Sequence, residues 1–133
     1  MFIDSLLQVS AAEAVASTEA SDDYIDLKAA GDAIGHELTF VCRVHTAFTT
    51  GDAATLSVAL QTDDNSSFSS PTTLAASGVL AVTAIDAVGD RPLVVKVGPG
   101  LQRYVRAYYT VGTGSFTNGK VDAFLVKDID LSR

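Results

Sequence analysis

The residues best suited to catalysis or metal binding are few in this chain of 133 residues. It has two histidines, His36 and His45, and one cysteine, Cys42. Neither histidine has an acidic or sulfur partner at the spacing of a metal site, and no Gly-x-Ser-x-Gly elbow is present. Cys42 lies in an alternating strand pattern, which favours a small buried apolar residue over a reactive thiol. We therefore expect no catalytic residue, no metal ligand and no cofactor.

Two further patterns resemble ligand sites but lack the required spacing. Asp63-Asp-Asn65 clusters the oxygen ligands that calcium prefers, without the glycine and glutamate of an EF-hand loop, so we expect a solvated turn. The C-terminal glycines (98, 100, 112, 114 and 119) form no phosphate-binding motif and are expected in turns. The sixteen acidic residues could include a glycosidase pair, which only their positions in space can decide. No pair stands out, and we expect no enzyme.

The most distinctive chemical pattern is a basic and aromatic run, Arg103-Tyr-Val-Arg-Ala-Tyr-Tyr-Thr-Val111. Alternate side chains of a strand point to the same face, so Tyr104, Arg106 and Tyr108 share one face. Both residue types are enriched at the hot spots of protein interfaces. Three roles remain open for this row: a protein interface, bracing of the fold with Arg106 paired to a carboxylate, and a carbohydrate platform.

A second β-rich run, Lys120-Val-Asp-Ala-Phe-Leu-Val126, follows a glycine-punctuated loop over residues 112–119. Two such runs joined by a glycine-containing loop predict a β-hairpin. We expect this hairpin, together with the N-terminal segment, to contact a partner. The candidate interface residues are Tyr104, Arg106, Tyr108, Phe116, Asn118 and Lys120.

Charge is divided unevenly along the chain. The formal net charge is −7, with 13 acidic and 2 basic residues over 1–90, and 3 acidic and 7 basic residues over 91–133. The acidic balance argues against nucleic acid as a partner, and no apolar run approaches the ~18 residues of a membrane span. A surface of both signs fits contacts between protein subunits, although an acidic balance also serves solubility alone.

The elements that must position these residues are strands. Alternation over 38–46 and over 55–62 predicts two long strands, with Leu56, Val58 and Leu60 facing inward. Shorter strands are expected over 24–27, 72–75, 79–83 and 93–97. About eight to nine strands without a long helical period predict an all-β protein, an antiparallel β-sandwich of the jelly-roll type. We divide it into an extended N-terminal arm (1–23), with one or two short strands, and a sandwich domain (24–133).

Several strand and turn segments together resemble one known family. They are the run from Leu60 to Leu74, the segments 103–111 and 116–126, and Tyr24-Ile-Asp-Leu27 followed by Ala30-Gly-Asp32. As a set, they are similar to the jelly-roll capsid cement or decoration proteins of short-tailed bacteriophages. The resemblance implies a structural protein that sits on the outside of an icosahedral capsid and clamps neighbouring subunits of the major capsid protein.

This resemblance sets the functional expectations. The partners would be the major capsid protein and further copies of the chain, with dimers preferred over trimers. The first residues lack the basic region of a signal peptide, so we expect synthesis in the bacterial host cytoplasm and a final place on the outer capsid surface of the virion. The alternative is a carbohydrate-binding β-sandwich module for receptor or glycan recognition, which predicts exposed tyrosines beside a groove.

Overall fold

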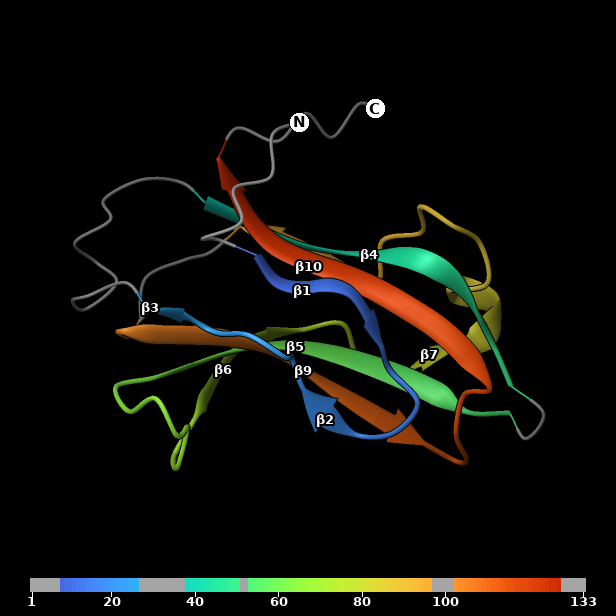
Figure 1. Ribbon diagram of the computed structural model, residues 1–133, viewed down its shortest axis with the longest axis horizontal. Helices are drawn as coiled ribbons and strands as arrows, with labels where there is room; N and C mark the ends of the chain where they lie inside the picture. The colour runs from blue at the N-terminus through green and yellow to red at the C-terminus, as the bar shows by residue number, and fades with distance from the viewer. Residues whose placement is uncertain (1–7, 27–37, 51–52, 97–101, 128–133) are drawn as a thin grey trace.

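Two antiparallel sheets pack face to face in the computed structural model, which describes residues 8–26, 38–50, 53–96 and 102–127 (Figure 1). The first sheet has the strand order β1-β10-β4-β8. In the second, β9 lies between β5 and the short strands β2 and β3, and β5 also pairs with β6 and β7. This is the jelly-roll arrangement of two four-stranded sheets, to the second of which β3 and β7 are added. The predicted all-β sandwich is confirmed.

The strands have the following bounds. The first sheet contains β1 (Gln8–Ala14), β4 (Leu38–Thr49), β8 (Leu93–Lys96) and β10 (Asn118–Lys127). The second contains β2 (Glu19–Ala20), β3 (Ile25–Asp26), β5 (Thr55–Asp63), β6 (Thr72–Ala76), β7 (Leu80–Ala81) and β9 (Tyr104–Gly112). The strand expected over 79–83 is shorter than predicted, because the 3₁₀ turn η3 (Val82–Ala84) follows β7 directly.

The predicted C-terminal hairpin is wrong. β9 pairs with β5, β2 and β3, whereas β10 pairs with β1 and β4, so the two strands belong to different sheets. Residues 113–117 therefore cross from one sheet to the other. Most successive strands of a jelly roll alternate between the sheets in this way. A glycine-containing loop between two β-rich runs is equally compatible with pairing and with crossing.

The core lies between the sheets and is formed by alternate residues of the long strands. Leu56, Val58 and Leu60 of β5 are buried, as the alternation predicts. The burial predicted for Cys42 on β4 is also confirmed, and desolvation raises the pKa of its thiol. These inward side chains leave the other face of each strand to form the outer surfaces of the sandwich.

The described part of the expected N-terminal arm is built into both sheets. β1 pairs with β10 and β2 pairs with β9, while Val9 and Val15 lie in the core. A buried polar contact also joins the sheets, since Ser10 Oγ on β1 lies 2.7 Å from the hydroxyl oxygen of Tyr109 on β9. Residues 1–7 lie outside the described residues, so a domain boundary at residue 23 stays a prediction.

Candidate interaction surface

The predicted aromatic and basic row lies on the outer face of the second sheet. Tyr104, Arg106 and Tyr108 are partly exposed, whereas the intervening Val105 and Ala107 are fully buried in the core. The alternation inferred from the sequence is therefore confirmed. The row is accessible from outside the sandwich instead of filling its interior.

A loop between β5 and β6 places another ring, that of Phe68, on the same face. Asp63 closes this loop: its Oδ1 accepts the N–H groups of Asp64 (2.7 Å) and Asn65 (3.3 Å), and its Oδ2 accepts that of Ser70 (2.9 Å). These bonds, with the one from Ser70 first among them, hold the pKa of Asp63 below its usual value. The acidic cluster thus shapes a turn, as expected. Over the described residues, no three His, Cys, Asp or Glu side chains form a group suited to a metal ion.

Aromatic rings and one guanidinium group interlock over this face. Tyr24 packs edge-on against Phe68, with ring centroids 6.1 Å apart, and against Tyr104, with centroids 5.4 Å apart. The Arg106 guanidinium carbon lies 4.3 Å from the Phe68 centroid and 5.3 Å from that of Tyr108. We call these five residues the aromatic–arginine surface. Tyr24 is 49% exposed, so part of this apolar area is open to a partner.

Arg106 lies on β9 and Arg103 directly precedes this strand, and the two arginines have different polar partners. Arg103 forms a two-pronged ion pair with Asp26, with Nε–Oδ1 at 2.8 Å and Nη2–Oδ2 at 3.1 Å. This contact raises the pKa of Arg103. Arg106 instead donates from Nε to the neutral Gln61 Oε1 at 2.9 Å, and desolvation lowers its pKa. The surface therefore combines apolar rings with a cation that forms no ion pair within the described residues, although the charge of Asp63 acts on it from nearby.

The structure separates the other candidate residues from this surface. Phe116 is only 4% exposed, because its ring packs edge-on against Phe48 at a centroid distance of 4.8 Å. It belongs to the core and cannot offer its ring to a partner, which corrects its selection as a contact residue. Asn118 and Lys120 are exposed, but they lie on β10 in the other sheet.

Three residues in or beside the aromatic–arginine surface were not identified from the sequence: Gln61, Phe68 and Tyr24. Gln61 was expected to face outward on β5, but only the register, which pairs it directly with Arg106, shows what it contacts. Phe68 is a lone aromatic residue in a polar loop, and this contrast is a signal that could have singled it out. Tyr24 carries no such signal, since its place beside Tyr104 depends on the pairing of β3 with β9.

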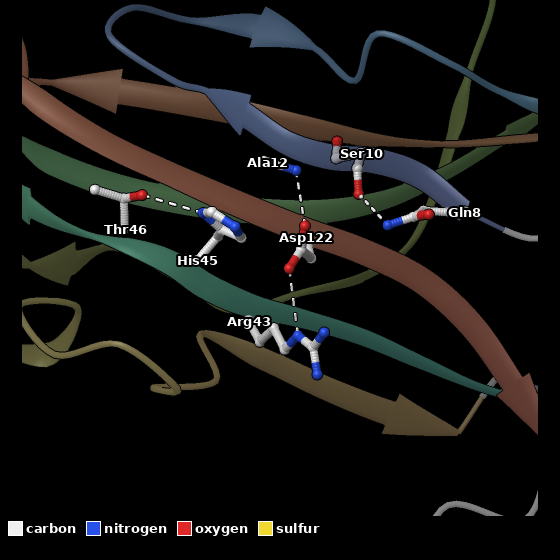
Figure 2. A network of polar contacts seen from close by, with 7 residues as sticks. All are labelled: Gln8, Ser10, Ala12, Arg43, His45, Thr46 and Asp122. Carbon is white, nitrogen blue, oxygen red and sulfur yellow. Dashed lines mark hydrogen bonds and ion pairs between the residues drawn. The ribbon is translucent and has the colours of Figure 1, made fainter. Parts of the chain in front are cut away.

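The outer face of the first sheet carries a different polar network, centred on Asp122 of β10 (Figure 2). Asp122 Oδ1 accepts the N–H of Ala12 on β1 at 2.7 Å, and its Oδ2 lies 3.4 Å from Nε of Arg43 on β4. The Arg43 guanidinium also lies over the Phe124 ring, 5.3 Å from its centroid. We call Ala12, Arg43 and Asp122 the Asp122 network. It fastens three adjacent strands together.

The histidines form no site within the described part of the chain. His45 is exposed on β4, and its Nδ1 lies 3.1 Å from Oγ1 of Thr46 (Figure 2). His36 lies outside the described residues, as do the turn expected over 30–32 and the glycines at 98 and 100.

A buried carboxylate lies between the two outer faces. Glu13 of β1 is 4% exposed, and its Oε1 accepts hydrogen bonds from Ser10 Oγ (2.6 Å) and from the N–H of Asp22 (2.7 Å). Its Oε2 has no hydrogen-bond partner among the described residues. Burial raises the pKa of Glu13, because the charged form loses hydration.

Fold and surface together define a class: a jelly-roll sandwich with an aromatic and cationic patch on one sheet. No helix in the described ranges has the length and apolar character needed to cross a membrane. Residues 9–125 match the Bbp16 family, and the chain belongs to this family. The family name points to a phage-related protein. No curated protein matches the chain.

Proposed function

We propose that this chain is a capsid cement protein of a tailed bacteriophage, bound to the outside of an icosahedral shell. Two findings support the proposal: membership of a family with a phage-related name, and a jelly-roll sandwich of the kind that cement proteins use. In this role the protein contacts neighbouring subunits of the major capsid protein. It acts as a homo-oligomer on the shell, with dimers preferred over trimers.

The observation that carries the proposal is the aromatic–arginine surface. It offers Tyr24, Tyr104, Tyr108 and Arg106 on one face of a sheet, and tyrosine and arginine dominate the energetic centres of protein interfaces. The strand β9 beneath them is hydrogen-bonded on both sides, to β5 and to β2 and β3. A stiff support of this kind lowers the entropy lost when a partner binds.

The physical task of a cement protein fits such a surface. Packaged DNA pushes a shell outward, and the boundaries between subunits are where the shell fails. A protein that bridges a boundary adds buried area there, typically about 800 Å² on each partner for a specific contact. Modest contacts repeated over many equivalent boundaries then act with multivalent strength.

Adding the purified protein to shells that lack it tests the proposal directly. We expect saturable binding, measured by cosedimentation, and an increase in the temperature at which the shells rupture. The variant Tyr104→Ala with Tyr108→Ala should bind less tightly and protect less, since each truncation of a hot-spot residue costs about 2 kcal/mol. Absence of binding by the folded wild-type protein would contradict the proposal.

The alternative, a carbohydrate-binding module, draws on one observation: the half-exposed ring of Tyr24 packs against Tyr104, a second ring that carries a hydroxyl group. Exposed aromatic rings beside hydrogen-bonding groups are able to stack on sugars. A glycan array with the wild-type protein and with Tyr24→Ala separates the alternatives. Clear hits that disappear in the variant would favour sugar recognition over capsid binding.

A further inference from the structure

The side chain of Arg106 is held in one orientation by three neighbours. Its Nε donates a 2.9 Å hydrogen bond to Oε1 of Gln61, the residue directly opposite on β5. Its guanidinium group lies over the rings of Phe68 (4.3 Å) and Tyr108 (5.3 Å). An arginine placed in this way loses little conformational entropy when its terminal nitrogens bind a ligand.

The positive charge of Arg106 is not matched by any ion pair within the described residues. Gln61 is neutral, and both carboxylate oxygens of Asp63 accept backbone N–H groups of the loop that follows β5. The group is partly withdrawn from water as well, which lowers its pKa. The Asp63 carboxylate favours the charged form of Arg106 from nearby, but it forms no ion pair with it, and its oxygens accept backbone N–H groups instead. A partly desolvated cation without an ion pair gains more from an incoming anion than a fully hydrated cation does.

Arg103 and Arg43 differ from Arg106 in that each of them meets a carboxylate. Arg103 is already paired with Asp26 through two contacts, and Arg43 lies 3.4 Å from Asp122. Arg106 differs from both, because its one hydrogen bond within the described residues goes from Nε to a neutral amide and its terminal nitrogens form none there. The difference is therefore in the partner that each arginine meets, since all three guanidinium groups lie within 5.3 Å of an aromatic ring centroid.

We infer that the terminal nitrogens of Arg106 bind a carboxylate of a protein partner, an aspartate or glutamate side chain, through two parallel hydrogen bonds. The inference deepens the proposed function and rests on it for the identity of the partner, a loop of the capsid subunit. Two N–H donors in one plane match the two oxygens of a carboxylate, and the surrounding rings exclude water from the contact. The flanking tyrosines supply the apolar part of the same contact.

A peptide titration tests the carboxylate preference without capsids. The full chain is titrated with acetyl-(Gly-Glu)-repeat amide and, as the matched control, with the corresponding Gly-Gln repeat, while the Nε–Hε NMR resonances of the arginines are followed. We expect the Arg106 resonance to shift with the glutamate peptide and not with the glutamine peptide. The Arg103 resonance should stay in place, because Asp26 occupies its donors. An unmoved Arg106 resonance, or equal shifts of both arginines, would overturn the inference.

Capsid binding provides the second arm. Arg106→Gln should weaken binding to shells by about tenfold or more, which corresponds to ~1.4 kcal/mol. Arg106→Lys keeps the charge but loses the planar pair of donors, so it should weaken binding as well, by a smaller factor. The matched control Arg103→Gln should change binding by less than about threefold. Thermal unfolding of each variant confirms that the fold is intact.

The two arms separate the inference from the proposed function. If shells bind the wild type and Arg106→Gln equally well, the carboxylate contact is wrong while the cement role stands. If the glutamate peptide shifts Arg106 but no shell binds the wild type, the cement role fails and the carboxylate site stands. Equal losses in Arg106→Gln and Arg103→Gln would indicate general charge attraction and would overturn the inference.

Discussion

The two outer faces of this sandwich use the same residue type for different purposes. On the first sheet, Arg43 is paired with Asp122 and lies over Phe124, a ring that is fully buried. On the second sheet, Arg106 is held by a neutral amide between rings on an open face. Nε of Arg43 meets a carboxylate within the chain, whereas Nε of Arg106 meets a neutral amide, so the two arginines differ in the charge of that partner. We therefore assign Arg43, which is paired with a carboxylate, to the stability of the fold, and Arg106, which forms no ion pair within the described residues, to the recognition of a partner.

The surroundings of the two arginines reinforce this difference. Val41, Phe124 and Val126 on the first sheet are buried already within the monomer, so they have little area left for a partner. On the second sheet, Tyr104 and Tyr108 remain partly exposed. The comparison predicts that mutations on the first face reduce folding stability, and that mutations on the second face reduce association.

Removing Asp122 should have the largest effect on stability. Asp122→Ala leaves the N–H of Ala12 without its acceptor and Arg43 without its counter-ion, and should lower the free energy of unfolding by about 2 kcal/mol. Urea unfolding followed by circular dichroism measures the loss. The control Asp122→Asn keeps an acceptor for Ala12 and should lose less. Equal stability of Asp122→Ala and the wild type would show that the network does not hold these strands.

Truncating each arginine in turn tests the comparison itself. Arg43→Ala should lower the free energy of unfolding by about 1 kcal/mol and leave shell binding unchanged, because its contacts lie within the chain. Arg106→Ala should cost no more than about 0.5 kcal/mol in stability, since relief of desolvation offsets the lost ring contacts. Its shell binding should fall. The reverse pattern in the two assays would show that the roles of the faces have been assigned the wrong way round.

The smallest effect is expected from Glu13, which lies between the faces. Its native pKa is raised, so the folded state holds the proton more tightly than the unfolded state, whose glutamate pKa is about 4.3. Stability should therefore fall as the pH rises from about 4.3 to the native pKa, and this component should be flat above it. Glu13→Gln removes the component, and urea unfolding over this pH range would show a shallower decline.

Glu19 provides the control for that measurement. Burial and the nearby Asp22 also raise its pKa, but it lies at a more exposed position on β2. Glu19→Gln should therefore flatten the pH dependence less than Glu13→Gln does. An identical pH dependence of the wild type and Glu13→Gln would contradict a raised native pKa of Glu13.

Much of the fold followed from local patterns. Alternation placed Leu56, Val58 and Leu60 in the core and Tyr104 and Arg106 outside it, because successive side chains of a strand point to opposite faces. The prediction that β9 and β10 form a hairpin was wrong, because it concerned which strands pair with each other. Pairing is decided by contacts between distant segments, such as β10 with β1, and a loop of glycines specifies only that the chain can turn.

The candidate site also contains residues that could be predicted from one strand and residues that could not. The Tyr104, Arg106 and Tyr108 row could be identified from one strand, but Phe116 was misplaced because its burial depends on Phe48, a residue far away in the sequence. The contacts of Gln61, Phe68 and Tyr24 with this row could not be inferred either. Those side chains meet the row only through the pairing of β5 and β3 with β9.

Local sequence patterns were enough to assign an acidic all-β chain whose residues 103–108 present tyrosine and arginine on one face. The physical reason is that strand alternation is a local property of the backbone. Which arginine meets a carboxylate depends instead on the pairing of distant strands. Asp122 reaches Arg43 and Asp26 reaches Arg103 across strands, while the strand beside Arg106 brings Gln61, and that register leaves the Arg106 guanidinium group without an ion pair among the described residues.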